Sequence, residues 1–406
     1  MTAFRLFLLA YLALGQIVAL FFLKKRLTQV FWRSALKAVY LAINFLVVLA
    51  IVQLYVFKAL PAEKFIWAYL YRPALTWFFG HAMWLTVAIV VWLIGVALSP
   101  FVNRAPKGLP QLFRAKKDGA TVGFIVFLAW FLCLGAAFYG YWVQQGEAVI
   151  RRSVVAIPTL PPELESLRIV HLSDFHYGLG ADLADLDRRL AQAEELKPDL
   201  ILLTGDLLDS NSSLARDFRE PLKRLSRARY GIYGVFGNHD LYANNPAEAA
   251  NVFSLLSVKI LRDETVNVPN LPLTIIGFDD PGVRSVFYRA DPNTKPLDFK
   301  NLKGPPIPQE NFKILLRHRP QGLTEAAAQG VNLYLAGHTH GGQFQAPWNP
   351  RLNLMTFSAP YTEGTYYLAP TTLIISSGLA SAGLPFRLWA WPEMGLITLT
   401  KGRANH

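Results

Sequence analysis

The 406-residue chain is predicted to be an α/β protein that carries an N-terminal domain of four membrane-spanning helices. Two observations indicate this class. Four long, nearly charge-free runs crowd the first 143 residues, and from residue 167 onward short apolar segments alternate with amphipathic ones. Such alternation is typical of a sheet covered by helices. We expect a transmembrane domain over 1–145, a linker over 146–165 and an α/β domain over 166–406.

Each apolar run is long enough to cross a bilayer as a helix, which takes about 20 residues. Buried helices of a soluble domain are the alternative, but four such runs so close together favour a membrane. The first run begins almost at Met1, so a cleaved signal peptide also competes. That run is too long for a usual signal and lacks a clear small-residue cleavage site, which favours a retained span. The expected spans are about 3–23, 38–57, 76–99 and 120–143.

The net charge of +12 is divided unevenly, with +11 on residues 1–150 and +1 on residues 151–406. The nearly neutral second part argues against nucleic acid as a partner. Lys and Arg concentrate in the first and third connectors between the spans, and such connectors stay in the cytoplasm. We therefore expect a multi-pass protein of the cell (inner) membrane, with the lipid bilayer as a partner and the second part outside the cytoplasm.

The second part is predicted to contain a series of strands and helices. Segment 281–310 has six prolines and little periodicity, so we expect a long surface loop there, with gating and decoration both open as roles. Strands are expected within 168–174, 199–206, 230–240, 271–280, 312–318 and 331–340, and helices within 182–197, 215–227 and 246–257.

Five of the expected strands end in side chains that bind metals. A single His-x-His pair, such as His338 and His340, is usually accidental. Five strand ends that all carry metal-binding side chains are not accidental, because open α/β sheets place their functional sites at the carboxyl ends of the strands. The five segments are HLSDFH (171–176), LLTGDLLD (202–209), FGNHD (236–240), LLRHR (315–319) and GHTH (337–340).

In this order, Asp-x-His, Gly-Asp, Gly-Asn-His-Asp, a single His and Gly-His-Thr-His resemble the calcineurin-like metallophosphoesterase superfamily, over about residues 166–400. The fuller forms SDFHYG and GHTHGGQ, with the tail SSGLASAGLPFRLWAWPE, are similar to its membrane-associated bacterial subgroup, which includes lipid-headgroup phosphoesterases. The resemblance implies an αββα sandwich and a metal-dependent phosphoesterase with two divalent ions.

The resemblance also implies how the ions are held. Asp206 is the candidate bridge, because only an anionic oxygen group can serve two ions closely. Mixed nitrogen and oxygen ligands without sulfur suit Mn, Fe or Zn. The pair of ions would supply a bridging hydroxide that attacks phosphorus in line with the leaving oxygen. The remaining ligands are expected to be Asp174, His176 and His340 for one ion, and Asn238, His318 and His338 for the other.

His239 resembles the family's catalytic histidine, which protonates or stabilises the leaving group. Asp240 is expected either to orient the His239 ring or to cap a helix. Asp209 has two similar interpretations, support of a neighbouring ligand or a cap. Arg317 and Arg319 flank the expected ligand at 318, where the subgroup often has small or amide residues. A guanidinium suits phosphate, so they are candidate substrate contacts, Arg319 first; a solvated loop pair is the alternative.

The sequence therefore predicts a membrane-bound dimetal phosphoesterase that hydrolyses a phosphodiester or pyrophosphate bond in a lipid-linked substrate. A phosphatase for soluble phosphoesters and a non-catalytic membrane sensor are the alternatives. Every expected ligand position is occupied, which favours catalysis. An apolar tail is either a membrane-facing lid or groove, or packs under the sheet edge; its residues are Leu384, Phe386, Leu388, Trp389 and Trp391.

Overall fold

The computed structural model divides into two compact units, Met1–Trp142 and Val143–His406. In the first unit, residues 80–89 are helical and α5 spans Gly119–Gln145, over the fourth predicted span. The first two predicted spans, apart from Phe45, and much of the third lie outside the described residues. Within the part that the structure describes, no helix has both the length and the apolar character that crossing a bilayer requires. The described residues are 45, 73–74, 76–77, 80–89, 119–178, 181–209, 211–243, 245–281, 297–357, 359–382 and 387–402.

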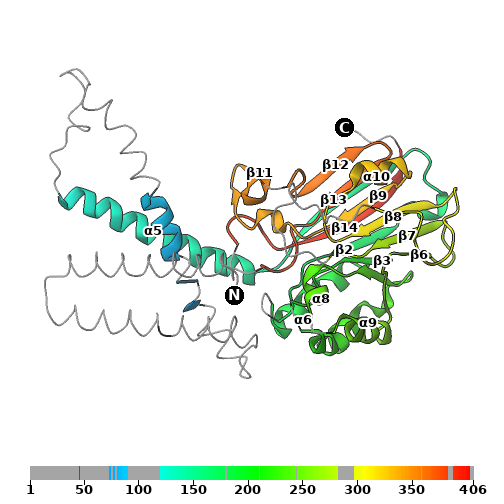
Figure 1. Cartoon of the computed structure of the whole chain (residues 1–406), viewed down its shortest axis with the longest axis horizontal. Coiled ribbons are helices and arrows are strands. Elements are labelled where there is room, and N and C mark those ends of the chain that lie inside the picture. Colours follow the sequence, from blue (N-terminus) through cyan, green and yellow to red (C-terminus); the bar gives the residue numbers. More distant parts are fainter. Residues whose placement is uncertain are drawn as a thin grey trace, which may run out of the picture. The chain divides into compact units, whose positions relative to one another are not determined.

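The second unit contains two six-stranded sheets (Figure 1). In the first, β2, β3, β4 and β5 run parallel; in the second, β7, β8, β9 and β13 do. The first sheet has the order β1 (Val149–Ile157), β14 (Glu393–Lys401), β2 (Arg168–Leu172), β3 (Leu200–Thr204), β4 (Ile232–Val235), β5 (Val258–Ile260). The second has the order β12 (Gly364–Leu368), β13 (Thr371–Ile375), β9 (Leu333–Ala336), β8 (Phe312–Arg317), β7 (Leu273–Phe278), β6 (Glu264–Asn267). A short hairpin, β10 (Gln345–Ala346) and β11 (Asn349–Asn353), stands apart from both.

Helices cover the outer faces of the two sheets. In Figure 1, α6 (Leu183–Glu195), α8 (Asn238–Tyr242) and α9 (Pro246–Leu255) lie beneath the first sheet, and α10 (Leu323–Ala328) lies over the second. One buried cluster joins the facing sides of the sheets, with Leu202, Leu335 and Ile397 fully buried in it. Two further clusters fill the space between each sheet and its helices. The predicted αββα layering is confirmed.

Local sequence explains the central elements. All five residues of β3, LILLT, are buried, as expected for a parallel strand covered on both faces. Helix α6 begins with a capping box, in which Asp182 accepts from the Asp185 backbone at 2.9 Å and Asp185 accepts in return at 3.3 Å. Its buried Leu186, Leu190 and Ala193 follow at helical spacing.

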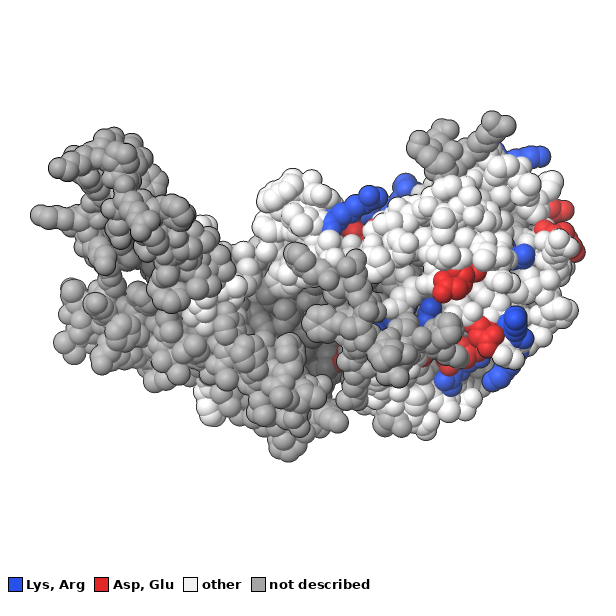
Figure 2. All heavy atoms as spheres, turned by 45° about the horizontal axis from the view of Figure 1, so that its top comes forward, with Lys and Arg blue, Asp and Glu red and all other residues white. Residues whose placement is uncertain are grey.

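Two predictions differ from the structure. The segment predicted as a linker contains β1, which pairs with β14 over its whole length. The helix expected within 215–227 is instead two 3-10 helices on either side of the five-residue α7 (Arg219–Lys223). The predicted loop 281–310 agrees with the structure where it is described, since residues 297–310 contain no helix or strand; residues 282–296 lie outside the described residues. Basic and acidic side chains are intermixed on the face of the second unit shown in Figure 2.

Candidate metal centre

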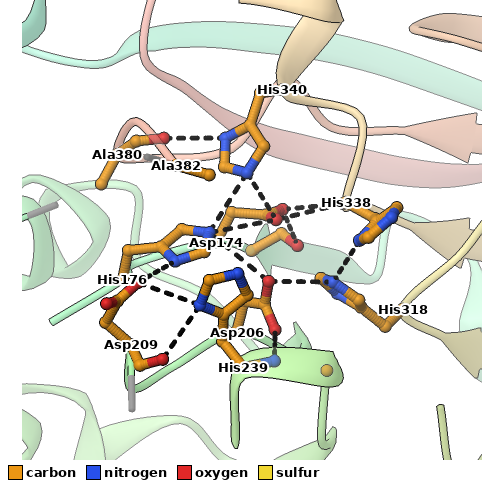
Figure 3. A network of polar contacts seen from close by, with 12 residues as sticks. Asp174, His176, Asp206, Asp209, His239, His318, His338, His340, Ala380 and Ala382 are labelled. Carbon is orange, nitrogen blue, oxygen red and sulfur yellow. Dashed lines mark hydrogen bonds and ion pairs between the residues drawn. The ribbon is translucent and has the colours of Figure 1, made fainter. Parts of the chain in front are cut away.

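The strand ends singled out in the sequence meet at one place (Figure 3). Residues following β2, β3, β8 and β9 bring their side chains together, as parallel strands ending at one edge require. Three groups of side chains in the described part of the chain have ligand atoms within 4.8 Å of one another: Asp174, His176 and His340; Asp206, His318 and His338; and His176, Asp206 and His239. The first two are the groups that the resemblance implied, and the third overlaps both and contains His239.

In the first group, the Nε2 atoms of His176 and His340 are 3.1 Å apart. The Oδ1 atom of Asp174 lies 3.4 Å from the His340 Nε2 and 3.9 Å from the His176 Nε2. All three side chains are buried. Three donor atoms therefore converge on one point, at which a cation would satisfy all of them.

Asp206 connects this group to the second. Its Oδ2 atom lies 3.4 Å from the His176 Nε2 and 3.1 Å from the His318 Nε2. The His318 Nε2 in turn lies 3.0 Å from the Nδ1 of His338. A single carboxylate oxygen thus faces both groups, which is the geometry of a bridging ligand.

Hydrogen bonds at the far side of three rings turn Nε2 toward the centre. The Nδ1 of His318 bonds the Thr204 carbonyl at 2.7 Å, and the Nδ1 of His340 bonds the Ala380 carbonyl at 2.9 Å. The Nδ1 of His176 lies 3.0 Å from Asp209 Oδ1. A carbonyl accepts only from an N–H, so Nδ1 carries a proton in His318 and His340, and Nε2 is the ring atom available to a metal ion.

Asn238 supplies independent support for a bound ion. The residue is 6% exposed, and its Oδ1 is buried without a hydrogen-bond partner in the described part of the chain. Such an acceptor is costly unless a cation or donor meets it. The nitrogen and oxygen donors of the centre and the unbonded Oδ1 of Asn238 both fit two divalent ions, without selecting one metal.

The electrostatics of the centre also favour bound positive charge. Burial lowers the pKa of His318, but Asp206 outweighs it and raises that pKa to about 9. Burial likewise lowers the pKa of His239, and Asp206 with Asp209 raises it to about 10. Burial raises the pKa of Asp206, yet His318 and His239 hold it well below its usual value. The centre therefore keeps ionised carboxylates that attract positive charge, as protons or as metal ions.

His239 lies beside the two groups, at the start of α8. Its backbone N–H donates to Asp206 Oδ1 at 2.8 Å. Its Nδ1 lies 2.9 Å from the Asp209 carbonyl and 3.0 Å from Asp209 Oδ1. With Nδ1 so engaged, Nε2 is the ring atom left for a substrate, and 28% of the side chain is exposed. Of the two interpretations of Asp209, the structure favours support of neighbouring rings.

Of the two interpretations of Asp240, the structure favours the helix cap over orientation of the His239 ring. The Asp240 carboxylate is fully buried and accepts three backbone N–H groups, from Gly237 at 2.9 Å, Leu207 at 3.2 Å and Leu208 at 2.8 Å. It therefore caps α8 and ties the turn after β3 to the turn after β4. Asp209 has the role at the His239 ring that the sequence offered to Asp240.

The two arginines beside His318 are buried and have internal partners, so the alternative of a solvated loop pair is wrong. Arg319 Nε lies 2.7 Å from Asp280 Oδ2, and Arg317 donates to the Gln321 carbonyl at 3.1 Å. Asp280 already pairs with the Arg319 guanidinium, so no bound phosphate is needed to balance its charge. A substrate role for either arginine stays a prediction. Asp280 is not among the candidate residues predicted from the sequence, although it ends the strand segment LTIIGFDD.

Arg387 is a second residue that the sequence did not reveal. Its guanidinium is fully buried, donates to the Ala380 carbonyl and lies 3.1 Å from the Nδ1 of His340. It also donates to the carbonyls of Ala390 and Trp391, at 3.5 and 3.3 Å. Arg387 thus connects a metal-ligand turn to the tail. In that tail, residues 383–386 lie outside the described residues.

Five of the candidate ligands have positive φ angles, in the left-handed region that few residues other than glycine adopt. In the described part of the chain, twelve non-glycine residues do so. Such conformations cost free energy and cluster at functional sites. The five are Asp174 (φ 55), His176 (φ 43), Asp206 (φ 50), His338 (φ 70) and His340 (φ 51).

Comparison with known proteins gives a consistent result. The family model for calcineurin-like phosphoesterase matches residues 167–342. The chain is 30% identical over 275 residues to an uncharacterized metallophosphoesterase of Helicobacter pylori (strain ATCC 700392 / 26695). The aligned region covers 66% of this chain and 70% of that protein. The chain is 28% identical over 272 residues to the uncharacterized metallophosphoesterase YkuE of Bacillus subtilis (strain 168), over 64% of this chain and 89% of that protein.

A third relative, from Bos taurus, is called "Transmembrane protein with metallophosphoesterase domain". It is 32% identical over 256 residues, which make up 60% of this chain. The matched part spans 55% of the Bos taurus protein, so that relative has a large portion without a counterpart in the alignment.

Proposed function

Since this chain belongs to the calcineurin-like metallophosphoesterases, which are metal-dependent phosphoesterases, we propose that it hydrolyses a phosphodiester or pyrophosphate bond. The observation that carries the proposal is Asp206 Oδ2, which faces the His176 ring at 3.4 Å and the His318 ring at 3.1 Å. Two divalent ions held on either side of it would supply positive charge for the phosphoryl oxygens and lower the pKa of water.

The chain's own residues account for the remaining steps. Two divalent ions would be held by Asp174, Asn238, Asp206, His176, His340, His318 and His338, and would thereby set the position of the reacting phosphorus. His239 carries a proton on Nε2 for the leaving oxygen, while Asp209 holds the opposite edge of the ring. The residues His176 and His340 are buried, so bulk water does not compete for the same positions.

We further propose that the substrate is lipid-linked and that the protein is a multi-pass protein of the cell membrane, with the second unit outside the cytoplasm. The four apolar runs within residues 1–143 and the name of the Bos taurus relative support this. One span would suffice as an anchor, whereas four fit a protein that meets its substrate at the bilayer surface.

The proposal is tested on the purified full-length protein in detergent, loaded with Mn²⁺. Asp206→Asn is expected to lose bound metal, measured by elemental analysis. His239→Ala is expected to keep the metal but to lose turnover of a chromogenic phosphodiester by about 10²–10⁴-fold. Wild-type turnover in both variants would overturn the assignment. A lipid-linked pyrophosphate in mixed micelles should be cleaved faster than its water-soluble analogue; equal rates would favour the soluble-substrate alternative.

A further inference from the structure

A hollow of about 230 Å³ lies beside the metal centre, behind the turn that carries His340. A methyl group placed on Gly341 would lie within 3.3 Å of both Gln345 Nε2 and Glu363 Oε2, two groups of the hollow's wall. The hollow is lined by residues from β1, β10, β11 and β14, and from the segments after β13 and before β12 and β14. The six that matter for its chemistry are Arg151, Gln345, Glu363, Trp389, Trp391 and Glu393.

The charges in the hollow favour a cation. Arg151 places Nε and Nη2 each at 2.8 Å from Glu393 Oε2, so these two side chains neutralise each other. Glu363 Oε2 accepts from Gln345 Nε2 at 2.5 Å and lies 3.5 Å from Ser377 Oγ. Both of these donors are neutral. The hollow therefore contains two carboxylates and one guanidinium, and the negative charge of Glu363 repels an anionic ligand.

The other wall is aromatic and held in place. Trp389 and Trp391 are 40% and 44% exposed, although they follow the buried Leu388. Backbone bonds attach this segment to the hairpin, from Gln345 to the Leu388 carbonyl at 3.0 Å. Arg387 donates a hydrogen bond to the Trp391 carbonyl at 3.3 Å. Indole faces attract cations by their ring quadrupole, and a fixed wall loses little conformational freedom when a ligand binds.

We propose that this hollow binds an ammonium group, on a lipid headgroup or on a free amine. The combination of a carboxylate with two indole rings suits a primary or quaternary ammonium ion. Its volume is below the ~300–1,000 Å³ of pockets that take a whole small molecule, and fits a headgroup-sized group. The site is separate from the metal ions, and its occupancy does not depend on hydrolysis.

The test uses the full-length, metal-loaded protein in an uncharged maltoside detergent, with choline chloride as the probe and saturation-transfer NMR as the readout. Wild type is expected to bind choline saturably. Glu363→Gln and Trp391→Leu are each expected to weaken binding at least about tenfold. Trp348→Leu is the matched control, because Trp348 is 80% exposed and does not line the hollow.

Two further arms make the result decisive. The neutral isostere 3,3-dimethyl-1-butanol should not displace choline; displacement would show an apolar hollow and overturn the proposal. Dihexanoyl phosphatidylcholine below its micelle concentration should bind more tightly than choline if the source is a lipid, and no more tightly if it is a free amine. If near-ultraviolet circular dichroism shows that Glu363→Gln is misfolded, Trp391→Leu decides, and unchanged choline binding there refutes the site.

Discussion

At the scale of single residues, the candidate ligands depend on neighbours that would not themselves touch an ion. One oxygen of Asp209 lies 3.0 Å from the Nδ1 of His176 and 3.0 Å from the Nδ1 of His239. A single carboxylate thus orients a metal ligand and the proposed proton donor together. Loss of such a partner affects both metal affinity and turnover.

Asp209→Ala is therefore expected to weaken metal binding by roughly 10–100-fold, because the His176 ring loses the acceptor that fixes it. Metal titration of the purified full-length protein measures this. Asp187→Ala is the matched control, since Asp187 pairs only at the exposed surface with Arg224 and lies away from the centre. Equal metal affinity in the Asp209 and Asp187 variants would contradict a positioning role.

Gly237 has a specific steric reason to be glycine. A Cβ added there would lie 2.2 Å from Asp206 Oδ1 and 2.5 Å from the Asp206 backbone nitrogen. Gly237→Ala is expected to displace the bridging carboxylate and to reduce metal affinity by more than about tenfold. In the control Gly402→Ala, the nearest atom is 3.8 Å from the new Cβ, so metal content should match wild type. Full metal content in the Gly237→Ala variant would show that Asp206 does not need this space.

At the scale of elements, the centre is assembled from turns that follow separate strands. Asp240 joins two of them, since its carboxylate at the start of α8 accepts from Leu207 and Leu208 after β3. Arg387 similarly joins the segment after β13 to the segment before β14, because it donates to the carbonyls of Ala380 and Trp391. These contacts connect turns that are remote in sequence, and each fixes one turn relative to another.

Asp240→Ala is expected to lower the free energy of unfolding by roughly 2–4 kcal/mol, because three buried backbone N–H groups lose their acceptor. Thermal unfolding followed by near-ultraviolet circular dichroism measures the change. The control is Glu220→Ala, whose exposed pair with Lys223 should contribute less than about 1 kcal/mol. A midpoint for the Asp240 variant equal to that of the control would refute the capping role.

At the scale of the whole molecule, β1 makes residues 146–165 part of the second unit. It pairs with β14 from Val149 to Ile157, and it buries Val155 and Ile157 in the core between the sheets. Without β1, the nine-residue β14 becomes an unprotected sheet edge.

A chain that starts at residue 146 is therefore expected to fold and to cleave a soluble chromogenic phosphodiester. One that starts at residue 166 is expected to aggregate or to unfold at a lower temperature, because it lacks β1. Size-exclusion chromatography and thermal unfolding of the two shortened chains test this. Equal midpoints and elution volumes would show that β1 is dispensable.

The α/β class and the strands that precede the ligands could be predicted from the sequence, and so, with the resemblance, could the convergence of Asp174, Asp206 and the four histidines. These depend on local patterns, since an apolar run predicts a buried strand and the residue after it lies at the sheet edge. Two of the three groups of ligand atoms divide these histidines as the resemblance implied.

Three features could not be predicted from the sequence and became visible in the folded chain: Asp209 rather than Asp240 contacts the His239 ring, Asp280 pairs with Arg319, and β1 completes a sheet. In each case the partners come from different elements of the fold or from distant parts of the chain. No local periodicity encodes such a pairing, because it arises from how the packed sheets and turns bring remote side chains together.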